Sequence, residues 1–332
     1  MKPIQLGVIG LGLIWQRAHQ PVLQELPELI QPVAFCDLSE ARRTATGEQF
    51  PHAPVVDSVD ALLALDGLDA VLVLTPIALN APTALKCIQA GKHVFMEKPI
   101  ARSLAEGRTL IAAARQADRQ LYVLEQMGYR PLETALHATL AAGEIGDLLL
   151  WERVQHLEAD TAQGALRYDS TPWRKQADYP LGTLFDGGIH LIAGLSRVFG
   201  QPQSVEATGR RLREEYGDYD QVTMTFRYAA GATGLLSHSA YLPPVHNFFY
   251  IHGTEGAITV ERNQFTIEKP AQPARVVEFP AENPYTGMWR QILRAYADGT
   301  EASYSTEDAL RDVATLLGVE RSIKSGERVA LS

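Results

Sequence analysis

The chain has 332 residues and a mass of 36.5 kDa, which at about 150 residues per domain predicts two domains. Hydrophobic residues make up 46% of the sequence, enough to build cores, so a disordered chain is excluded. The formal net charge is −9 and there is no block of Lys or Arg, which disfavours a nucleic-acid partner. The longest apolar run, residues 70–79, is too short to cross a membrane, so we expect no membrane partner. Two cysteines, Cys36 and Cys87, cannot form a disulfide framework, and we therefore expect a cytoplasmic protein.

Short apolar runs alternate with helical patterns in the first third of the chain. The patterns predict strands at residues 4–9, 33–36, 70–74, 93–96 and 121–124. They predict helices at residues 13–26, 41–50, 60–65, 82–90 and 104–117. Strands that alternate with helices indicate a parallel sheet with right-handed crossovers.

Longer strands dominate the rest of the chain. The patterns predict strands at residues 148–156, 221–228, 233–239, 248–252 and 257–261, and helices at 131–142, 285–298 and 305–324. We therefore place the domains at residues 1–123 and 124–332.

The turn after the first predicted strand has the glycines of a dinucleotide-binding fold. Gly10 permits a tight turn, and Gly12 lets the backbone approach a pyrophosphate at a helix N-terminus. Asp37 ends the second strand, where a carboxylate would accept hydrogen bonds from ribose hydroxyls, although it could also be a helix cap. A carboxylate there disfavours a 2′-phosphate, so NAD is favoured, and Arg42 keeps NADP as the second candidate. Trp15 occupies the position where such folds need a small residue.

Two further features suggest catalysis but are individually ambiguous. Lys98 follows the strand at 93–96, at the edge of the sheet where ligands bind, yet a lone lysine is usually a surface charge. Asp186 and His190 share one face if their segment is helical, so the carboxylate could orient the imidazole. Such a pair is common by chance, and Gly187 and Gly188 between the two disfavour a helix.

Taken in order, these motifs resemble the Gfo/Idh/MocA family of glucose–fructose oxidoreductases and inositol dehydrogenases, nearly end to end. The resemblance is carried by Gly7–Gly12 with His19 and Pro21, Thr75-Pro76, Gly91–Val94, Glu97-Lys98-Pro99, Gly143–Gly146, Trp173-Arg174, Asp186 with His190, Gly253–Gly256, and Ser322 with Ser325-Gly326.

The resemblance implies an α/β fold, with an N-terminal Rossmann doubly wound parallel sheet and a C-terminal α/β domain that holds a large, mostly antiparallel open sheet. It implies an NAD(P)-dependent oxidoreductase that moves a hydride between the nicotinamide and a CH–OH or C=O carbon of a sugar, polyol or related molecule. It also implies that the C-terminal domain binds the substrate and that the protein forms a homodimer or homotetramer through the C-terminal sheet.

Motif by motif, the resemblance assigns roles to individual residues. Cofactor binding is expected from Gly10, Gly12, Leu13, Ile14, Asp37, Arg42, Thr75, Pro76, Asn80, Glu97 and Lys98. Substrate binding is expected from Lys98, Asp186 and His190 by the resemblance. It is also expected from Tyr129, Arg130, Trp173 and Arg174, because aromatic and guanidinium groups suit hydroxyl-rich ligands, although each of these four could equally serve ordinary packing or a surface ion pair. Structural roles are expected for His156, Tyr168, His238 and His246, and no residues have the spacing of metal ligands.

The chemistry of alcohol oxidation fits three of these residues. Hydride leaves a carbinol carbon only if the hydroxyl proton is removed as well, which requires a positioned base. We expect His190 to be the acid/base, Lys98 to stabilise the developing alkoxide, and Asp186 to support them, although Lys98 and His190 could exchange roles.

The sequence departs from the family pattern near the expected substrate. Asn80 stands where many members have His, and Ala193 stands where Asp often follows the histidine by three residues. These departures leave the precise substrate open. Two other functions also stay open, an NAD-dependent glycosidase of the same fold and a non-catalytic dinucleotide sensor.

Overall fold

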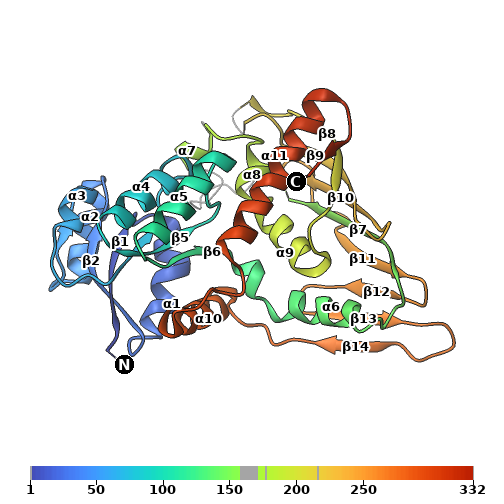
Figure 1. Ribbon diagram of the computed structural model, residues 1–332, viewed down its shortest axis with the longest axis horizontal. Coiled ribbons are helices and arrows are strands. Elements are labelled where there is room, and N and C mark those ends of the chain that lie inside the picture. The colour runs from blue at the N-terminus through green and yellow to red at the C-terminus, as the bar shows by residue number, and fades with distance from the viewer. Residues whose placement is uncertain (1, 158–170, 176–177, 215–216, 332) are drawn as a thin grey trace. The chain divides into compact units, whose positions relative to one another are not determined.

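The structure is a computed structural model that describes residues 2–157, 171–175, 178–214 and 217–331 (Figure 1). The chain divides into two compact units, Met1–Gln126 with Asn283–Leu310, and Met127–Glu282 with Arg311–Ser332. The expected boundary at residues 123 and 124 is close to the first crossing, but Asn283–Leu310 belongs to the first unit and not to the second. The reason is the apolar face of its helix, where Trp289 is fully buried and packs on Phe95 with ring centroids 5.3 Å apart.

The first unit contains the predicted doubly wound sheet. Its six strands are β1 (Ile4–Ile9), β2 (Ile30–Cys36), β3 (Val55–Val56), β4 (Ala70–Val73), β5 (His93–Glu97) and β6 (Leu121–Leu124). They pair in parallel in the order β3-β2-β1-β4-β5-β6, which is the order of a dinucleotide-binding fold. Every residue of β4 is buried, which explains why its sequence is a continuous apolar run.

Helices connect these strands. They are α2 (Glu40–Gln49), α3 (Val59–Leu63), α4 (Ile77–Gln89) and α5 (Leu104–Gln116), and α10 (Pro284–Asp298) joins them from the far end of the chain. The predicted first helix contains a π-helical turn, η1 (Trp15–His19), followed by α1 (Gln20–Gln24). Trp15 is 1% exposed and its ring lies 5.9 Å from that of Phe35, so the indole that replaces the usual small residue is part of the core.

The second unit contains a nine-stranded sheet in the order β14-β13-β12-β11-β7-β10-β9-β8-β15. Its strands are β7 (Leu148–His156), β8 (Ser204–Arg210), β9 (Gln221–Arg227), β10 (Thr233–Ser239), β11 (Phe248–Gly253), β12 (Ala257–Val260), β13 (Gln264–Glu268), β14 (Arg275–Glu278) and β15 (Val329–Ala330). Among these described strands only β7 and β10 pair in parallel, so the mostly antiparallel sheet is confirmed.

Helices cover one face of this sheet. The remaining helical segments are η2 (Gln126–Tyr129), α6 (Pro131–Ala141), α7 (Pro172–Lys175), α8 (Thr183–Asp186), α9 (Ile189–Phe199) and α11 (Thr306–Ser325). Phe199 of α9 stacks on Trp151 of β7 with centroids 5.2 Å apart, and the Ser322 hydroxyl of α11 accepts a hydrogen bond from the Ala207 amide. Leu235 and Tyr250, on the opposite face, are 36% and 39% exposed. Within the described ranges, no helix combines the length and the apolar character needed to cross a membrane.

Candidate active site

The turn after β1 is shaped by Gly10. Its φ is +95°, and a Cβ there would lie 2.6 Å from the Leu74 carbonyl oxygen, so only glycine fits. Gly12 differs, because the nearest atom to a Cβ added at this position would be Nη1 of Arg42 at 3.7 Å. The protein therefore has no steric need for glycine at position 12, which fits a backbone kept bare for a ligand. Leu13 and Ile14 follow at the start of the helical segment and are half-buried.

Asp37 ties the end of β2 to this glycine turn. Its Oδ2 accepts a hydrogen bond from the Leu11 amide at 2.8 Å, and its Oδ1 accepts one from the Ser39 amide at 2.8 Å. Arg42 lies 3.4 Å from the same carboxylate, with half of its side chain exposed. A buried carboxylate beside an accessible guanidinium provides both an acceptor for ribose hydroxyls and a cation for a phosphate.

Asn80 connects the ends of β4 and β5. The Thr75 hydroxyl donates to its Oδ1 at 2.9 Å, and its amide donates to the Glu97 carbonyl at 3.1 Å. Asn80 is only 1% exposed and ties the turn that begins at Thr75-Pro76 to the end of β5, while its role in cofactor binding stays a prediction. Pro76 is the N-cap residue of α4.

Glu97 fixes the start of the segment that carries Lys98. Its Oε1 lies 2.8 Å from Nε2 of His19, and its Oε2 accepts a hydrogen bond from the Lys98 amide at 3.2 Å. The imidazole is completely buried, and the carboxylate nearly so. The backbone of Lys98 is therefore held by a hydrogen bond to the Glu97 carboxylate, while the residue itself is half-exposed.

The predicted cofactor residues of the first unit meet at one edge of the sheet. Gly10, Asp37, Thr75 and Lys98 follow the carboxyl ends of β1, β2, β4 and β5, which are parallel neighbours. Ligands of open α/β sheets bind at this edge. The strained glycine at position 10, the open space at Gly12 and the carboxylate of Asp37 fit a dinucleotide.

In the second unit, Asp186 pairs with Arg174. Nε of Arg174 donates to Oδ2 of Asp186 at 2.5 Å, and Nη2 donates to Oδ1 at 3.5 Å. The guanidinium also lies over the Trp173 ring, 4.1 Å from its centroid. The two side chains are 17% and 14% exposed, so a bidentate, largely buried pair fixes the carboxylate. The sequence singled out both residues but not their pairing.

Asp186 and His190 lie on two short helices and not on one continuous helix. Asp186 ends α8, and α9 begins at Ile189, with Gly188 as its N-cap residue. A Cβ at Gly188 would lie 2.5 Å from the Leu184 carbonyl oxygen, so the close approach of the two helical turns explains this glycine. His190 is half-buried. Nearby, burial raises the pKa of the Tyr179 hydroxyl, and the charge of Asp186 adds to this shift.

Tyr129 and Arg130 have structural surroundings. Tyr129 is 4% exposed. Arg130 uses Nε in an ion pair with Glu133 at 3.3 Å, Nη2 on the Arg262 carbonyl at 3.0 Å, and Nη1 on the Met127 sulfur at 3.5 Å. Their expected role in substrate binding stays a prediction. Of the four residues expected to be structural, Tyr168 lies outside the described residues.

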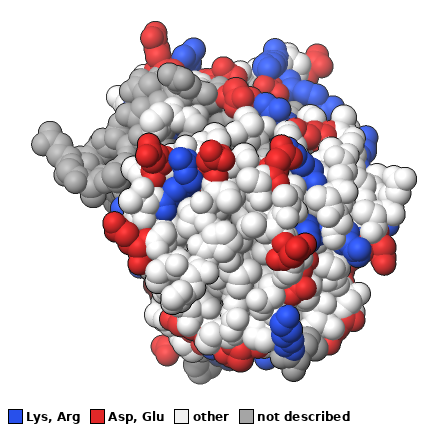
Figure 2. Space-filling view, turned by 90° about the vertical axis from the view of Figure 1, so that its left-hand side faces the viewer, with Lys and Arg blue, Asp and Glu red and all other residues white. Residues whose placement is uncertain are grey.

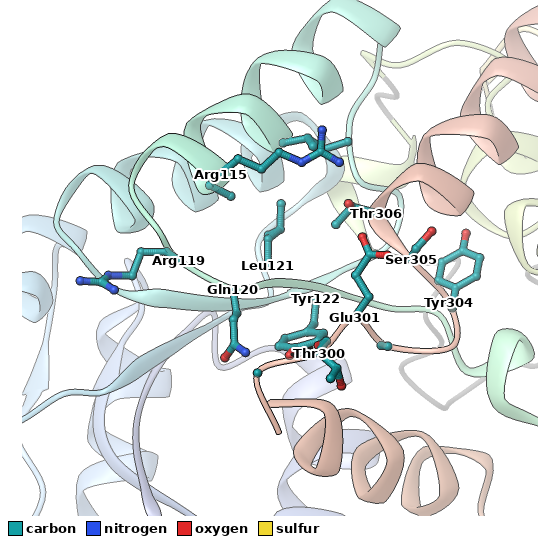
Figure 3. Close-up of a pocket in the computed structure, with 14 residues that line it drawn as sticks. Arg115, Arg119, Gln120, Leu121, Tyr122, Thr300, Glu301, Tyr304, Ser305 and Thr306 are labelled. Carbon is teal, nitrogen blue, oxygen red and sulfur yellow. Dashed lines mark hydrogen bonds between the residues drawn. The ribbon is translucent and has the colours of Figure 1, made fainter. Parts of the chain in front are cut away.

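A pocket of about 180 Å³ lies elsewhere in the first unit, beside α5 and the start of β6 (Figure 3). Gln120 and Tyr122 at the amino end of β6 donate to the carbonyls of Tyr296 and Thr300, so this region holds the returning segment after α10. It lies at the amino ends of the strands and is therefore distinct from the cofactor edge.

Charge is not segregated on the face drawn in Figure 2, where Lys and Arg are interspersed with Asp and Glu. An anionic ligand on this face would therefore depend on individually placed groups. Among the described residues, no cluster of His, Cys, Asp or Glu is placed to hold a metal ion.

The strand order, the glycine turn and the carboxylate after β2 together define a dinucleotide-binding class of protein. Residues 4–125 match the model of the oxidoreductase family with the NAD-binding Rossmann fold, and residues 134–259 match that of the GFO/IDH/MocA C-terminal domain. The chain belongs to the Gfo/Idh/MocA oxidoreductase family.

Comparisons with individual proteins agree with this assignment. The chain is 28% identical over 255 residues to the scyllo-inositol 2-dehydrogenase (NADP(+)) of Bacillus subtilis, covering 76% of this chain and 68% of that protein. It is 27% identical over 341 residues to the dTDP-3,4-didehydro-2,6-dideoxy-alpha-D-glucose 3-reductase of Streptomyces violaceoruber, covering 100% and 92%. A crystal structure of an oxidoreductase from Thermotoga maritima superimposes with a TM-score of 0.92 at 25% identity, covering 99% of this chain and 98% of that one.

Proposed function

We propose that this protein is an NAD(P)-dependent dehydrogenase or reductase that acts on a CH–OH or C=O carbon of a sugar, polyol or related small molecule. The observation that carries the proposal is the position of Lys98, at the same sheet edge as Gly10 and Asp37 and with its backbone held by buried Glu97. The inositol and dTDP-sugar substrates in the names of two relatives support this substrate class.

Three side chains perform the chemistry in this proposal. The nicotinamide, when bound, accepts the hydride of the carbinol carbon or returns it. His190 takes the hydroxyl proton, so that the alcohol becomes a carbonyl, and gives it back in the reverse direction. The Lys98 ammonium donates to the same oxygen and stabilises the negative charge that develops on it. Asp186, fixed by its two contacts with Arg174, positions the substrate or the imidazole.

The test is an NAD(P)H absorbance assay with a panel of sugars, inositols and sugar acids. We expect Lys98→Met and His190→Ala each to lower kcat/KM by about 10²–10⁴-fold. Lys86→Met is the matched control, because this exposed lysine pairs with Asp60 on the surface, and it should retain full activity. Full turnover in both Lys98→Met and His190→Ala contradicts the assignment. Cleavage of aryl glycosides would favour a glycosidase, and retained cofactor without turnover of any panel member would favour a sensor.

We also propose that two or four copies assemble through the uncovered face of the C-terminal sheet. Leu235 and Tyr250 are exposed there, and Phe248 stacks on Tyr250 with centroids 5.0 Å apart. Light scattering should give a dimeric or tetrameric mass that falls on Leu235→Glu, and a monomeric wild type contradicts this assembly. A cytoplasmic location is proposed with it, since Cys36 and Cys87 are both buried free thiols.

A further inference from the structure

Three polar side chains form a cluster on the helix-covered face of the nine-stranded sheet. Arg153 and Gln155 are two residues apart on β7, and His238 lies on the adjacent strand β10, paired in register with Gln155. Side chains at these positions point to the same face, because side chains alternate along a strand. We call Arg153, Gln155 and His238 the β7–β10 polar cluster.

The hydrogen-bonding capacity of this cluster is largely unused. Arg153 makes one hydrogen bond, from Nη2 to Oε1 of Gln155 at 3.4 Å, and its guanidinium lies 5.1 Å from the centroid of the Phe249 ring. A guanidinium has five N–H donors, so four have no protein acceptor among the described residues. His238 is 3% exposed, and neither of its ring nitrogens has a partner within the same ranges. Buried polar groups in native proteins are normally satisfied, so this arrangement requires an explanation.

The charge of the cluster is positive. Burial lowers the pKa of Arg153 to about 10, so the guanidinium is still charged at neutral pH. The carboxylate of Glu133 affects Arg153 electrostatically but pairs directly with Arg130 at 3.3 Å. Burial also lowers the pKa of His238 to about 4, so this imidazole is neutral and offers one donor and one acceptor. Arg153 is therefore a half-buried cation with no ion-pair partner in the described part of the chain.

Helix α9, which carries His190, packs on the strand that carries Arg153 and Gln155. A Cβ at Gly194 would lie 3.4 Å from Cε of Met127 and 3.9 Å from Cγ of Glu133. The absence of a side chain at Gly194 thus lets α9 approach Glu133, and Phe199 at the end of the same helix stacks on Trp151, two residues before Arg153 on β7. His190 lies one helical turn before Gly194, on the same face of α9.

We propose that Arg153, supported by Gln155 and His238, binds a carboxylate of the substrate. The substrate is then a sugar acid or another polyhydroxy acid and not a neutral sugar. A planar carboxylate matches the donor fork of one guanidinium, and a neutral imidazole adds a further donor. A phosphate dianion would bring two negative charges to a site with one cation, whereas a carboxylate matches that charge. The inference rests on the proposed function, because it specifies the substrate of the same enzyme.

The test compares matched pairs of compounds that differ only in one terminal group. Glucose and glucuronate, and galactose and galacturonate, exchange a CH₂OH group for a carboxylate. We measure kcat/KM with NAD⁺ and NADP⁺, and separately measure binding of glucuronate and glucose by calorimetry. The proteins are wild type, Arg153→Met, Arg153→Lys and the control Arg321→Met, which removes an exposed arginine from α11.

We expect the wild type to prefer the acid of each pair by at least about tenfold. Arg153→Met should remove this preference. It should lower kcat/KM for the acid about 10- to 100-fold and change kcat/KM for the neutral sugar little. Arg153→Lys keeps the charge but not the donor fork, so its preference for the acid should lie between those of the wild type and Arg153→Met. Arg321→Met should match the wild type. Circular dichroism verifies that each variant is folded, and Arg153→Lys keeps the test valid if Arg153→Met does not fold.

The outcomes separate this inference from the proposed function. Turnover of the neutral sugars without a preference for acids, unchanged in the Arg153 variants, overturns the carboxylate site and leaves the oxidoreductase intact. No turnover of any compound, together with Arg153-dependent binding of glucuronate, contradicts the proposed function but supports the anion site. Absence of both turnover and glucuronate binding overturns the carboxylate site as well.

Discussion

The indole of Trp289 donates a hydrogen bond from Nε1 to Nδ1 of His19 at 3.0 Å, across 270 residues of sequence. An indole nitrogen is only a donor, so Nδ1 must be the acceptor, and the proton of the neutral imidazole lies on Nε2. Nε2 then donates to Oε1 of Glu97 at 2.8 Å, and Oε2 accepts the Lys98 amide. Trp289 of α10 thus fixes the tautomer of His19. His19 in turn holds the Glu97 carboxylate, which accepts the backbone amide of Lys98, the proposed catalytic lysine.

Breaking this relay should be costly because all its members are buried. We expect His19→Ala to lower the free energy of unfolding by about 2–5 kcal/mol, since it removes the hydrogen-bond partner of Glu97 Oε1 and of the Trp289 indole. Trp289→Phe should cost less, and a double-mutant cycle of the two should give a coupling energy of at least about 1 kcal/mol. Urea unfolding measures each value.

Tyr296→Phe is the matched control on the same helix. The Tyr296 ring packs 5.7 Å from Phe95, and its hydroxyl has no hydrogen bond among the described residues, so its removal should cost under about 0.5 kcal/mol. Additive effects of His19→Ala and Trp289→Phe would show that the two residues do not act together.

The two glycines of the nucleotide turn should respond differently to alanine. Gly10→Ala places a methyl group 2.6 Å from the Leu74 carbonyl at a positive φ, so it should lower the free energy of unfolding by at least about 2 kcal/mol. Gly12→Ala has room within the protein and should retain stability, but it should weaken NADH binding about tenfold or more by blocking the approach of the pyrophosphate.

Thermal unfolding and NADH fluorescence titration distinguish these two effects. Gly47→Ala is the control, since no atom lies within 4 Å of the added methyl in α2 and the helix should gain about 1 kcal/mol. An unchanged NADH affinity in Gly12→Ala would remove this residue from the cofactor site.

Local patterns were sufficient for much of the fold. The strands β6, β7 and β10 have the predicted bounds, because each is a run of apolar or alternating residues, the pattern typical of a strand with at least one buried face. The strand β8 was missed, since only Val205 and Ala207 are buried in a mostly polar segment. The family motifs likewise pointed to Gly10, Asp37 and Lys98, which all follow the carboxyl ends of strands in one parallel sheet, while their roles stay predictions.

Contacts between residues far apart in the chain could not be predicted from the sequence. The role of Asn80 at the cofactor stays a prediction, and the sequence did not show that its amide donates to the Glu97 carbonyl, 17 residues away. Helix α10 was assigned to the wrong unit, because no local pattern encodes its contact with His19. His238 was expected to be satisfied, whereas its ring nitrogens have no partner within the described ranges. Each of these depends on which surfaces the tertiary fold brings together.

Cofactor preference should depend on the pair formed by Asp37 and Arg42. We expect NADH to bind more tightly than NADPH, because the Asp37 carboxylate repels a 2′-phosphate. Asp37→Ser should weaken the binding of NADH and strengthen the binding of NADPH. Arg42→Ala should weaken the binding of NADPH about tenfold, because its exposed guanidinium, 3.4 Å from the Asp37 carboxylate, is placed to pair with the 2′-phosphate. Fluorescence titrations with both cofactors give the ratios. Arg108→Ala, an exposed arginine on α5, is the control. Tighter NADPH binding by the wild type would reverse the assigned preference.

The buried imidazole of His238 should make stability depend on pH. Burial, aided by the charges of His156 and Arg153, lowers its pKa to about 4 from the ordinary value of 6.5. Between these values the unfolded chain binds a proton that the folded protein does not, so the stabilisation is complete above about pH 6.5 and is lost as the pH falls towards 4. We expect the free energy of unfolding of the wild type, relative to His238→Phe, to fall by about 2 kcal/mol from pH 7 to pH 5. Urea unfolding at both values measures this difference, and titration of the other groups cancels in the comparison. A difference between the two proteins that stays constant with pH would mean that His238 is protonated equally in the folded and unfolded states.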